Sequence, residues 1–119
     1  MSKIIIIEDS QKDQDFLANI LKKAGHQVIA ASDGQTGIFL CLEKRPDIAF
    51  LDVMMPDING IEVLKWIREE LPEIKVILCT GAGDGSLVDL AMRLGAQGYI
   101  VKPYDADQIF MSLQRIIGV

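Results

Sequence analysis

The sequence predicts a doubly wound α/β domain built around a parallel sheet. Short apolar runs, each bounded by polar residues, alternate five times with segments of helical periodicity. Such an alternation favours right-handed crossovers between parallel strands. The chain has 119 residues, of which 50% are hydrophobic, which suits one domain with its own core. We therefore expect residues 1–119 to form a single domain.

The first two strand–helix units follow from local patterns. Residues 4–7 are four isoleucines, and such a β-branched run predicts a buried strand. Ser10 can cap the next helix, whose apolar residues keep the three-to-four spacing of one buried stripe. These residues are Phe16, Leu17, Ile20, Leu21 and Ala24. Residues 28–31 predict the second strand, and the helix after it lies between Asp33 and Pro46.

The remaining three units show the same alternation. Strands are expected at residues 48–52, 74–80 and 98–101. Helices are expected around residues 61–71, 87–94 and 109–117. The turn residues of segment 56–60 separate the third strand from its helix, Pro72 stops that helix, and a glycine-rich loop at 81–85 follows the fourth strand.

Ionisable side chains follow three of the predicted strands. Glu8 and Asp9 come after the first strand, Asp52 ends the third, and Lys102 comes after the fifth. The carboxyl ends of parallel strands meet at one edge of the sheet, where ligands bind in open α/β folds. We therefore expect three carboxylates and one ammonium to converge there.

This group of charges suggests metal-assisted phosphoryl chemistry. Carboxylates that lie close together repel one another, so they favour a divalent cation between them. Mg²⁺ prefers oxygen ligands, commonly one or two carboxylates with waters and a phosphate oxygen. Asp52, beside a metal, the Thr80 hydroxyl and the Lys102 ammonium, is equipped to attack a phosphoryl group. We predict a Mg²⁺ site and an aspartyl phosphate on Asp52.

The same residues carry a resemblance to the receiver domain of response regulators in two-component signalling. In that family an acidic pair, a D-x-x-M-P-x-x-x-G pattern, a Thr or Ser and a Lys-Pro pair follow successive strands. The chain has Glu8-Asp9, Asp52 to Gly60 in that pattern, Thr80 and Lys102-Pro103. The resemblance covers essentially the whole chain. It implies a stand-alone, flavodoxin-like (βα)5 three-layer sandwich with strand order 2-1-3-4-5.

The resemblance also implies a set of metal ligands. Asp9, Asp52 and the backbone carbonyl of Met54 would bind Mg²⁺. Glu8 stands where the family more often has Asp, and its longer side chain favours contact through a water. We expect the side chains of Met54 and Met55 to pack as apolar residues, because thioethers are poor Mg²⁺ ligands.

A switch is implied as well. Thr80 and Lys102 would bind the phosphoryl group, and the peptide between Lys102 and Pro103 would be cis, a bond that proline makes accessible. Tyr99, three residues before the lysine, is expected to couple to Thr80. Phosphorylation would then change the surface of the fourth helix, fifth strand and fifth helix.

The implied partners are proteins. A sensor histidine kinase or a histidine phosphotransfer protein would donate the phosphoryl group, and a downstream effector protein would read the switch. The chain would not be an enzyme for separate substrates and would catalyse only its own phosphorylation and dephosphorylation. Met54 and Ala82, two residues beyond Asp52 and Thr80, have no polar group to orient a water, so we predict slow dephosphorylation.

Composition excludes other classes of partner. The formal net charge is −5, from 12 basic and 17 acidic residues, and no run of Lys or Arg offers a basic stripe for nucleic acid. No apolar stretch approaches the roughly 20 residues that span a membrane, and the chain begins with a strand instead of a signal peptide. We expect a cytoplasmic monomer, or a dimer linked to phosphorylation. Cys41 and Cys79 should be buried, reduced thiols.

Other functions on this architecture need residues that the sequence lacks. A haloacid-dehalogenase-type phosphatase needs a second Asp where Met54 stands. A flavodoxin-like FMN carrier needs a hydroxyl- and glycine-rich phosphate loop after the first strand, where the acidic segment 8–11 would repel a phosphate. A purely adaptor receiver would be recognised by loss of Asp52 or Lys102, and both are present. A complete protein and a receiver excised from a longer chain both fit the sequence.

Overall fold

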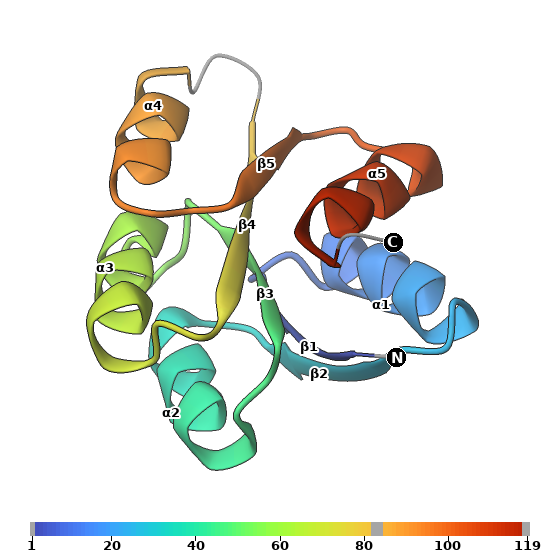
Figure 1. Cartoon of the computed structure of the whole chain (residues 1–119), viewed down its shortest axis with the longest axis horizontal. Coiled ribbons are helices and arrows are strands. Elements are labelled where there is room, and N and C mark those ends of the chain that lie inside the picture. The colour runs from blue at the N-terminus through green and yellow to red at the C-terminus, as the bar shows by residue number, and fades with distance from the viewer. Residues whose placement is uncertain (1, 82–84, 118–119) are drawn as a thin grey trace.

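Five parallel strands form the middle layer of the structure, a computed structural model that describes residues 2–81 and 85–117. The strands are β1 (Lys3–Ile7), β2 (Gln27–Ala31), β3 (Ile48–Asp52), β4 (Lys75–Thr80) and β5 (Gly98–Val101). The helices are α1 (Gln11–Lys23), α2 (Gly34–Lys44), α3 (Gly60–Glu70), α4 (Gly85–Arg93) and α5 (Ala106–Ile117). Helices α1 and α5 cover one face of the sheet and α2, α3 and α4 the other (Figure 1). The strand order is β2-β1-β3-β4-β5, which confirms the predicted fold.

The sheet is buried on both faces, as β1 illustrates. Successive side chains of a strand point to opposite faces. Ile4 and Ile6 therefore enter the core under α1 and α5, while Ile5 and Ile7 enter the core under α2, α3 and α4. Strand β3 pairs with β1 on one side and with β4 on the other, and it is buried along its whole length. Its last residue, Asp52, is thus held at the centre of the sheet edge.

Helix α1 departs from its predicted stripe. Leu17 and Leu21 are buried as expected, but Ala24 is exposed and the Phe16 side chain is 45% exposed. Phe16 instead lies beside Tyr104, which follows β5, with ring centroids 6.1 Å apart. The prediction was wrong at the two ends of the stripe, because periodicity indicates which residues share a helix face but not how much of that face the sheet covers.

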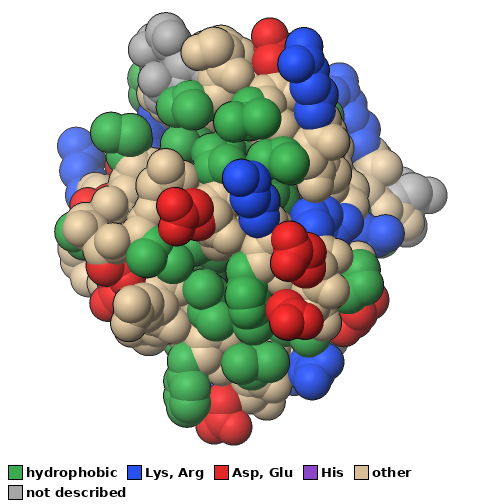
Figure 2. All heavy atoms as spheres, turned by 90° about the vertical axis from the view of Figure 1, so that its left-hand side faces the viewer, with side chains coloured by type: hydrophobic (Ala, Val, Ile, Leu, Met, Phe, Trp, Pro, Cys, Tyr) green, Lys and Arg blue, Asp and Glu red, His purple; other side chains and the backbone are tan. Residues whose placement is uncertain are grey.

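Helix α2 packs on the sheet through small residues. A Cβ on Gly37 would lie 2.7 Å from Cδ1 of Ile7, and Cys41 is fully buried on the same side of the helix. The larger side chains of Phe39 and Leu42 are exposed. Figure 2 views the face formed by α2, α3 and α4, where exposed hydrophobic side chains lie among acidic and basic ones.

Both cysteines are free and buried, as predicted. Burial raises the pKa of the Cys41 thiol to about 11, and it raises the pKa of the Cys79 thiol further. The reactive thiolate is therefore disfavoured at both positions. None of the helices in the described part of the chain is long and apolar enough to cross a membrane.

Candidate functional site

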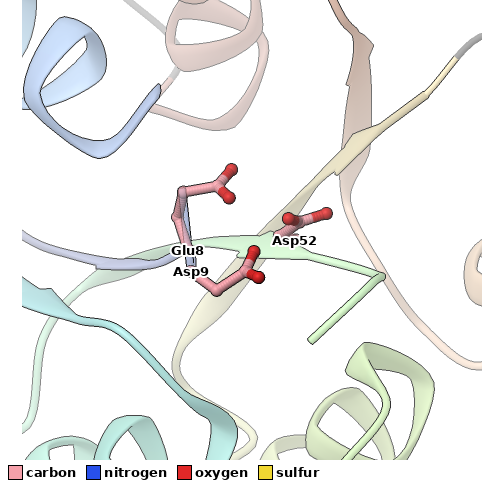
Figure 3. A group of neighbouring side chains, drawn as sticks. All are labelled: Glu8, Asp9 and Asp52. Carbon is pink, nitrogen blue, oxygen red and sulfur yellow. The ribbon is translucent and has the colours of Figure 1, made fainter. Parts of the chain in front are cut away.

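The predicted acidic group is assembled where the sheet order reverses. From β1 the chain runs outward to β2 and then returns to β3 on the other side of β1, so the ends of β1 and β3 border a topological switch point. One carboxylate oxygen from each of Glu8, Asp9 and Asp52 lies within 4.8 Å of the other two. Figure 3 shows the three side chains pointing into the same space beyond the strands. The predicted convergence is confirmed.

Lys102 supplies the positive charge of the site. Its backbone N–H donates to the carbonyl of Thr80 at 2.7 Å, which ties the residue after β5 to the end of β4. Its Nζ lies 2.7 Å from Oε1 of Glu8, 3.3 Å from Oδ2 of Asp52 and 3.2 Å from Oδ2 of Asp13. One ammonium thus faces carboxylates from three different parts of the chain.

The charged groups of the site change one another's pKa values. Burial raises the pKa of the Glu8 carboxyl to about 7; the neighbouring Asp52 adds to this shift and Lys102 opposes it. Burial alone would lower the pKa of the Lys102 ammonium, but its hydrogen bond to Glu8 and the nearby carboxylate charges outweigh that effect and raise it. Glu8 is 3% exposed, and its Oε2 also accepts a hydrogen bond from the backbone N–H of Ser10 at 3.0 Å.

The loop after β3 is folded tightly against Asp52. The N–H of Met54 donates to Oδ1 of Asp52 at 3.2 Å, and the N–H of Gly60 donates to the carbonyl of Val53 at 2.8 Å. A Cβ on Gly60 would lie against the Asp52 carbonyl oxygen and 2.7 Å from Cα of Val53, so this position requires glycine. The Met54 side chain is 68% exposed, which makes the prediction of apolar packing wrong there, because the turn directs it outward; Met55 does pack on the core.

Asp57 fixes the other end of the same loop. Its carboxylate accepts hydrogen bonds from the backbone N–H groups of Gly34 and Gln35, both at 2.9 Å, at the first turn of α2. These two bonds lower the pKa of the Asp57 carboxyl. Ile58 packs so closely on Gly34 that a Cβ there would lie 2.5 Å from the Ile58 side chain. The loop that carries the Met54 carbonyl is therefore attached to α2.

Comparison with known proteins decides the family. The family model described as "Response regulator receiver domain" matches residues 4–114. The chain belongs to this family. It is 34% identical over 116 residues to chemotaxis protein CheY of Listeria monocytogenes, covering 97% of this chain and 98% of that protein. It is 32% identical over 115 residues to sporulation initiation phosphotransferase F of Bacillus subtilis, covering 97% of this chain and 93% of that protein.

Solved structures agree with this assignment. A response regulator receiver domain protein from Clostridium thermocellum superposes with a TM-score of 0.94 at 29% identity, over 99% of this chain and 95% of that one. The protein is thus a CheY-like receiver of two-component signalling. Receivers bind Mg²⁺ in an acidic site. The Glu8, Asp9 and Asp52 carboxylates fit that ion, because they supply a compact set of hard oxygen donors.

The receiver's predicted switch residues, Thr80 and Tyr99, lie on the neighbouring strands β4 and β5. Thr80 is 1% exposed, and its Oγ1 has no hydrogen-bond partner within residues 2–81 and 85–117. Tyr99 is 48% exposed. Both line a hollow of about 290 Å³ that also touches α4 at Val88 and Asp89.

Two further sequence predictions concern the ends of β4 and β5. The cis peptide expected between Lys102 and Pro103 is confirmed. Ala82, which entered the prediction of slow dephosphorylation, and the rest of segment 82–84 in the glycine-rich loop lie outside the described residues.

Two residues near the receiver site were missed from the sequence. Asp13 pairs with Lys102, and Gln14 is buried and donates from Nε2 to the Glu8 carbonyl at 3.1 Å. A signal existed for Asp13, since it lies in the first turn of the helix that starts beside the acidic pair. Gln14 occupies a place that periodicity would give to an apolar residue, so the sequence offered no comparable signal for it.

Proposed function

We propose that this receiver accepts a phosphoryl group on Asp52 from a phosphohistidine of a sensor kinase or a histidine phosphotransfer protein. The observation that carries this proposal is the position of Asp52. It ends the central strand, with the acidic pair after β1 on one side and Lys102 after β5 on the other. With Nζ of Lys102 3.3 Å from Oδ2 of Asp52, groups on both sides can reach the oxygens of an attached phosphoryl group.

The chemistry needs little from the protein beyond positioning and charge. A carboxylate oxygen of Asp52 would form a bond to phosphorus while the bond from phosphorus to the donor imidazole nitrogen breaks, and that electron pair stays on the imidazole. The Lys102 ammonium and the Thr80 hydroxyl would donate hydrogen bonds to phosphoryl oxygens as their charge develops. The receiver would catalyse only its own phosphorylation and dephosphorylation.

The acidic group would hold Mg²⁺ through Asp9, Asp52 and the Met54 carbonyl. Glu8 would act through a water, and its contacts support this role, because one oxygen already accepts from Lys102 and the other from a backbone amide. Bound Mg²⁺ supplies positive charge against the phosphoryl oxygens in such a site.

A surface beside Lys102 suits a protein donor. Phe16, Pro103 and Tyr104 line a hollow of about 520 Å³, and the charged residues Lys12, Asp13 and Lys102 line it too. The lining is mostly apolar, and the Phe16 side chain is 45% exposed there. A protein seated in this hollow could present an imidazole to Asp52 across Lys102.

The face formed by α4, β5 and α5 is the proposed output surface. It carries exposed apolar side chains at Met92, Tyr99, Val101 and Met111, and a hollow of about 320 Å³ lies between β5 and α5. Repacking of Tyr99 when Thr80 engages the phosphoryl group would change the affinity of this face for an effector protein. We propose that the receiver acts in this way as a monomer in the cytoplasm.

Slow dephosphorylation remains part of the proposal. The Met54 side chain stands two residues after Asp52, is exposed beside the site and has no polar group to orient an attacking water. We therefore expect the phosphoryl group to persist for longer than seconds once the donor is removed.

Intact mass after incubation with Mg²⁺ and acetyl phosphate tests the proposal. We expect a single phosphate adduct on the wild type and none on Asp52→Asn. Circular dichroism would check that both proteins are folded, and removal of acetyl phosphate would then give the lifetime of the adduct. A folded wild type that binds Mg²⁺ but gains no adduct would support the adaptor function instead.

A further inference from the structure

Lys102 has one more anionic partner than its proposed chemistry needs. Its Nζ lies 2.7 Å from Glu8, 3.3 Å from Asp52 and 3.2 Å from Asp13. An ammonium carries three N–H donors. Hydrogen bonds to Glu8 and Asp52 use two of them, and the ion pair with Asp13 leaves little of the third free for another anion. Before Lys102 can donate to a phosphoryl oxygen, it must therefore release or share one of these partners.

The three partners differ in how easily they can be released. The side chains of Glu8 and Asp52 are 4% and 8% exposed. Removing the cation from a carboxylate buried to that extent has a large cost in free energy, because the charge is left unpaired and without water. The side chain of Asp13 is 39% exposed, so water can replace Lys102 at little cost. Asp52 is also the residue that would carry the phosphoryl group. Asp13 is thus the partner that Lys102 gives up most easily.

We propose that Asp13 is a positioning residue that occupies the third donor of Lys102 before phosphorylation and yields it to a phosphoryl oxygen. The inference rests on the proposed function. Asp13 competes with the incoming group for Lys102, and its own charge repels that group, so it raises the concentration of phosphodonor that the receiver needs. Asp13 thereby sets a threshold for phosphorylation without taking part in the bond changes.

The surroundings of Asp13 allow a clean substitution. It lies in the first turn of α1, where its backbone N–H donates to Oγ of Ser10 at 3.3 Å, a bond that Asp13→Asn retains. Asp15 on the same helix offers a matched control, because it is exposed and accepts a hydrogen bond from Gln11 at 2.8 Å. The salt bridges of Lys102 in the described part of the chain do not include Asp15.

The test is the initial rate of phosphorylation against acetyl phosphate concentration at saturating Mg²⁺. We expect Asp13→Asn to lower the half-saturating concentration roughly threefold to fivefold, the factor that corresponds to one partly exposed ion pair, with the maximal rate unchanged. Asp15→Asn removes the same charge from α1 and should stay close to the wild type. Asp13→Glu restores the carboxylate and should return the half-saturating concentration toward the wild-type value.

Several results would overturn the inference. Equal half-saturating concentrations for Asp13→Asn and Asp15→Asn, in variants with the same urea midpoint, would show that only net charge matters. A slower maximal rate in Asp13→Asn would show that Asp13 assists the transfer and does not restrain it. If the folded wild type gains no phosphate at all, the proposed function fails and the role of Asp13 fails with it.

Discussion

The two halves of the site differ in how fully their polar groups are engaged. In the acidic half, both carboxylate oxygens of Glu8 and both of Asp52 accept hydrogen bonds from Lys102 or the backbone. In the half formed by β4 and β5, the buried Thr80 hydroxyl has no partner among the described residues, and Tyr99 is half exposed beside a hollow. The first half is arranged before any ligand arrives, whereas the second has room to rearrange.

Under the proposed function, this difference would separate phosphoryl binding from signalling within one small domain. Groups that must recognise an anion and a cation benefit from fixed geometry, because little reorganisation is then needed when the charge arrives. A switch needs a second arrangement within a few kcal/mol of the first. An unengaged buried hydroxyl next to an open hollow supplies one, since a new hydrogen bond would stabilise the alternative arrangement.

The largest effect is expected from Gly60→Ala, which disturbs the loop against Asp52 in the acidic half of the site. A Cβ at this position would collide with the backbone of Asp52 and Val53, so Gly60→Ala must displace the loop. We expect the free energy of unfolding to fall by about 2–4 kcal/mol and the yield of phosphate adduct to drop. Urea unfolding and intact mass measure both effects.

Gly98→Ala is the matched control for Gly60→Ala. A Cβ at Gly98 would meet nothing within 4 Å, so this variant should keep the stability and phosphorylation of the wild type. If the two alanine variants behaved alike, the close approach of Gly60 to the Asp52 backbone would not be what holds the loop.

A smaller effect should appear in the pH dependence of stability. The pKa of the Glu8 carboxyl is about 7 in the folded protein against its usual 4.5, so between these pH values the folded state binds more protons than the unfolded chain. Stability contributed by this group is therefore lost as the pH rises through that window. Glu8→Gln cannot ionise, so its stability relative to the wild type should rise by about 1–3 kcal/mol between about pH 4 and pH 8.

Urea unfolding of both proteins with a chelator present measures this difference. Parallel stability curves for wild type and Glu8→Gln across that range would contradict the raised pKa. In the wild type, added Mg²⁺ should reduce the loss of stability at high pH, because the cation favours ionised carboxylates.

The smallest effect on stability, and the sharpest on signalling, is expected at Thr80. Thr80→Val replaces a buried hydroxyl that has no partner in the described chain, so we expect stability to stay the same or rise by up to about 1 kcal/mol. The phosphorylated variant, however, cannot form the new hydrogen bond. Phosphorylation should then no longer change the environment of the Tyr99 ring. The NMR chemical shifts of that ring measure the change.

Thr80→Ser provides the comparison, because it retains the hydroxyl. It should preserve the response of Tyr99 to phosphorylation. An equal response in the Val and Ser variants would show that the hydroxyl does not connect the two halves of the site.

The sequence was sufficient to predict the sheet and the acidic half of the site. Buried strands end where the apolar run ends, and parallel strands bring those ends together, so the positions of Glu8, Asp9, Asp52 and Lys102 followed from strand boundaries alone. The family resemblance added the strand order and the cis peptide, and the structure confirms both.

The contacts that the sequence did not predict depend on tertiary packing. Asp13 and Lys102 are far apart in the sequence, and only the tertiary fold brings the first turn of α1 within 3.2 Å of the residue that follows β5. The outward direction of Met54 depends on the turn that brings Gly60 against Asp52. The ring that lies beside Phe16 is that of Tyr104, which follows β5 and is far away in the sequence. Local periodicity contains none of this information.

The burial of both thiols makes the chain convenient for site-specific chemistry. Alkylating reagents attack the thiolate, and the raised pKa values and burial of Cys41 and Cys79 keep both sulfurs protonated and shielded. A cysteine introduced by Met111→Cys, at a position that is 55% exposed on α5, would therefore react far faster than either native thiol. A fluorescent dye could be attached there in the native background, so the proposed output face could be followed in real time during the proposed phosphorylation of Asp52.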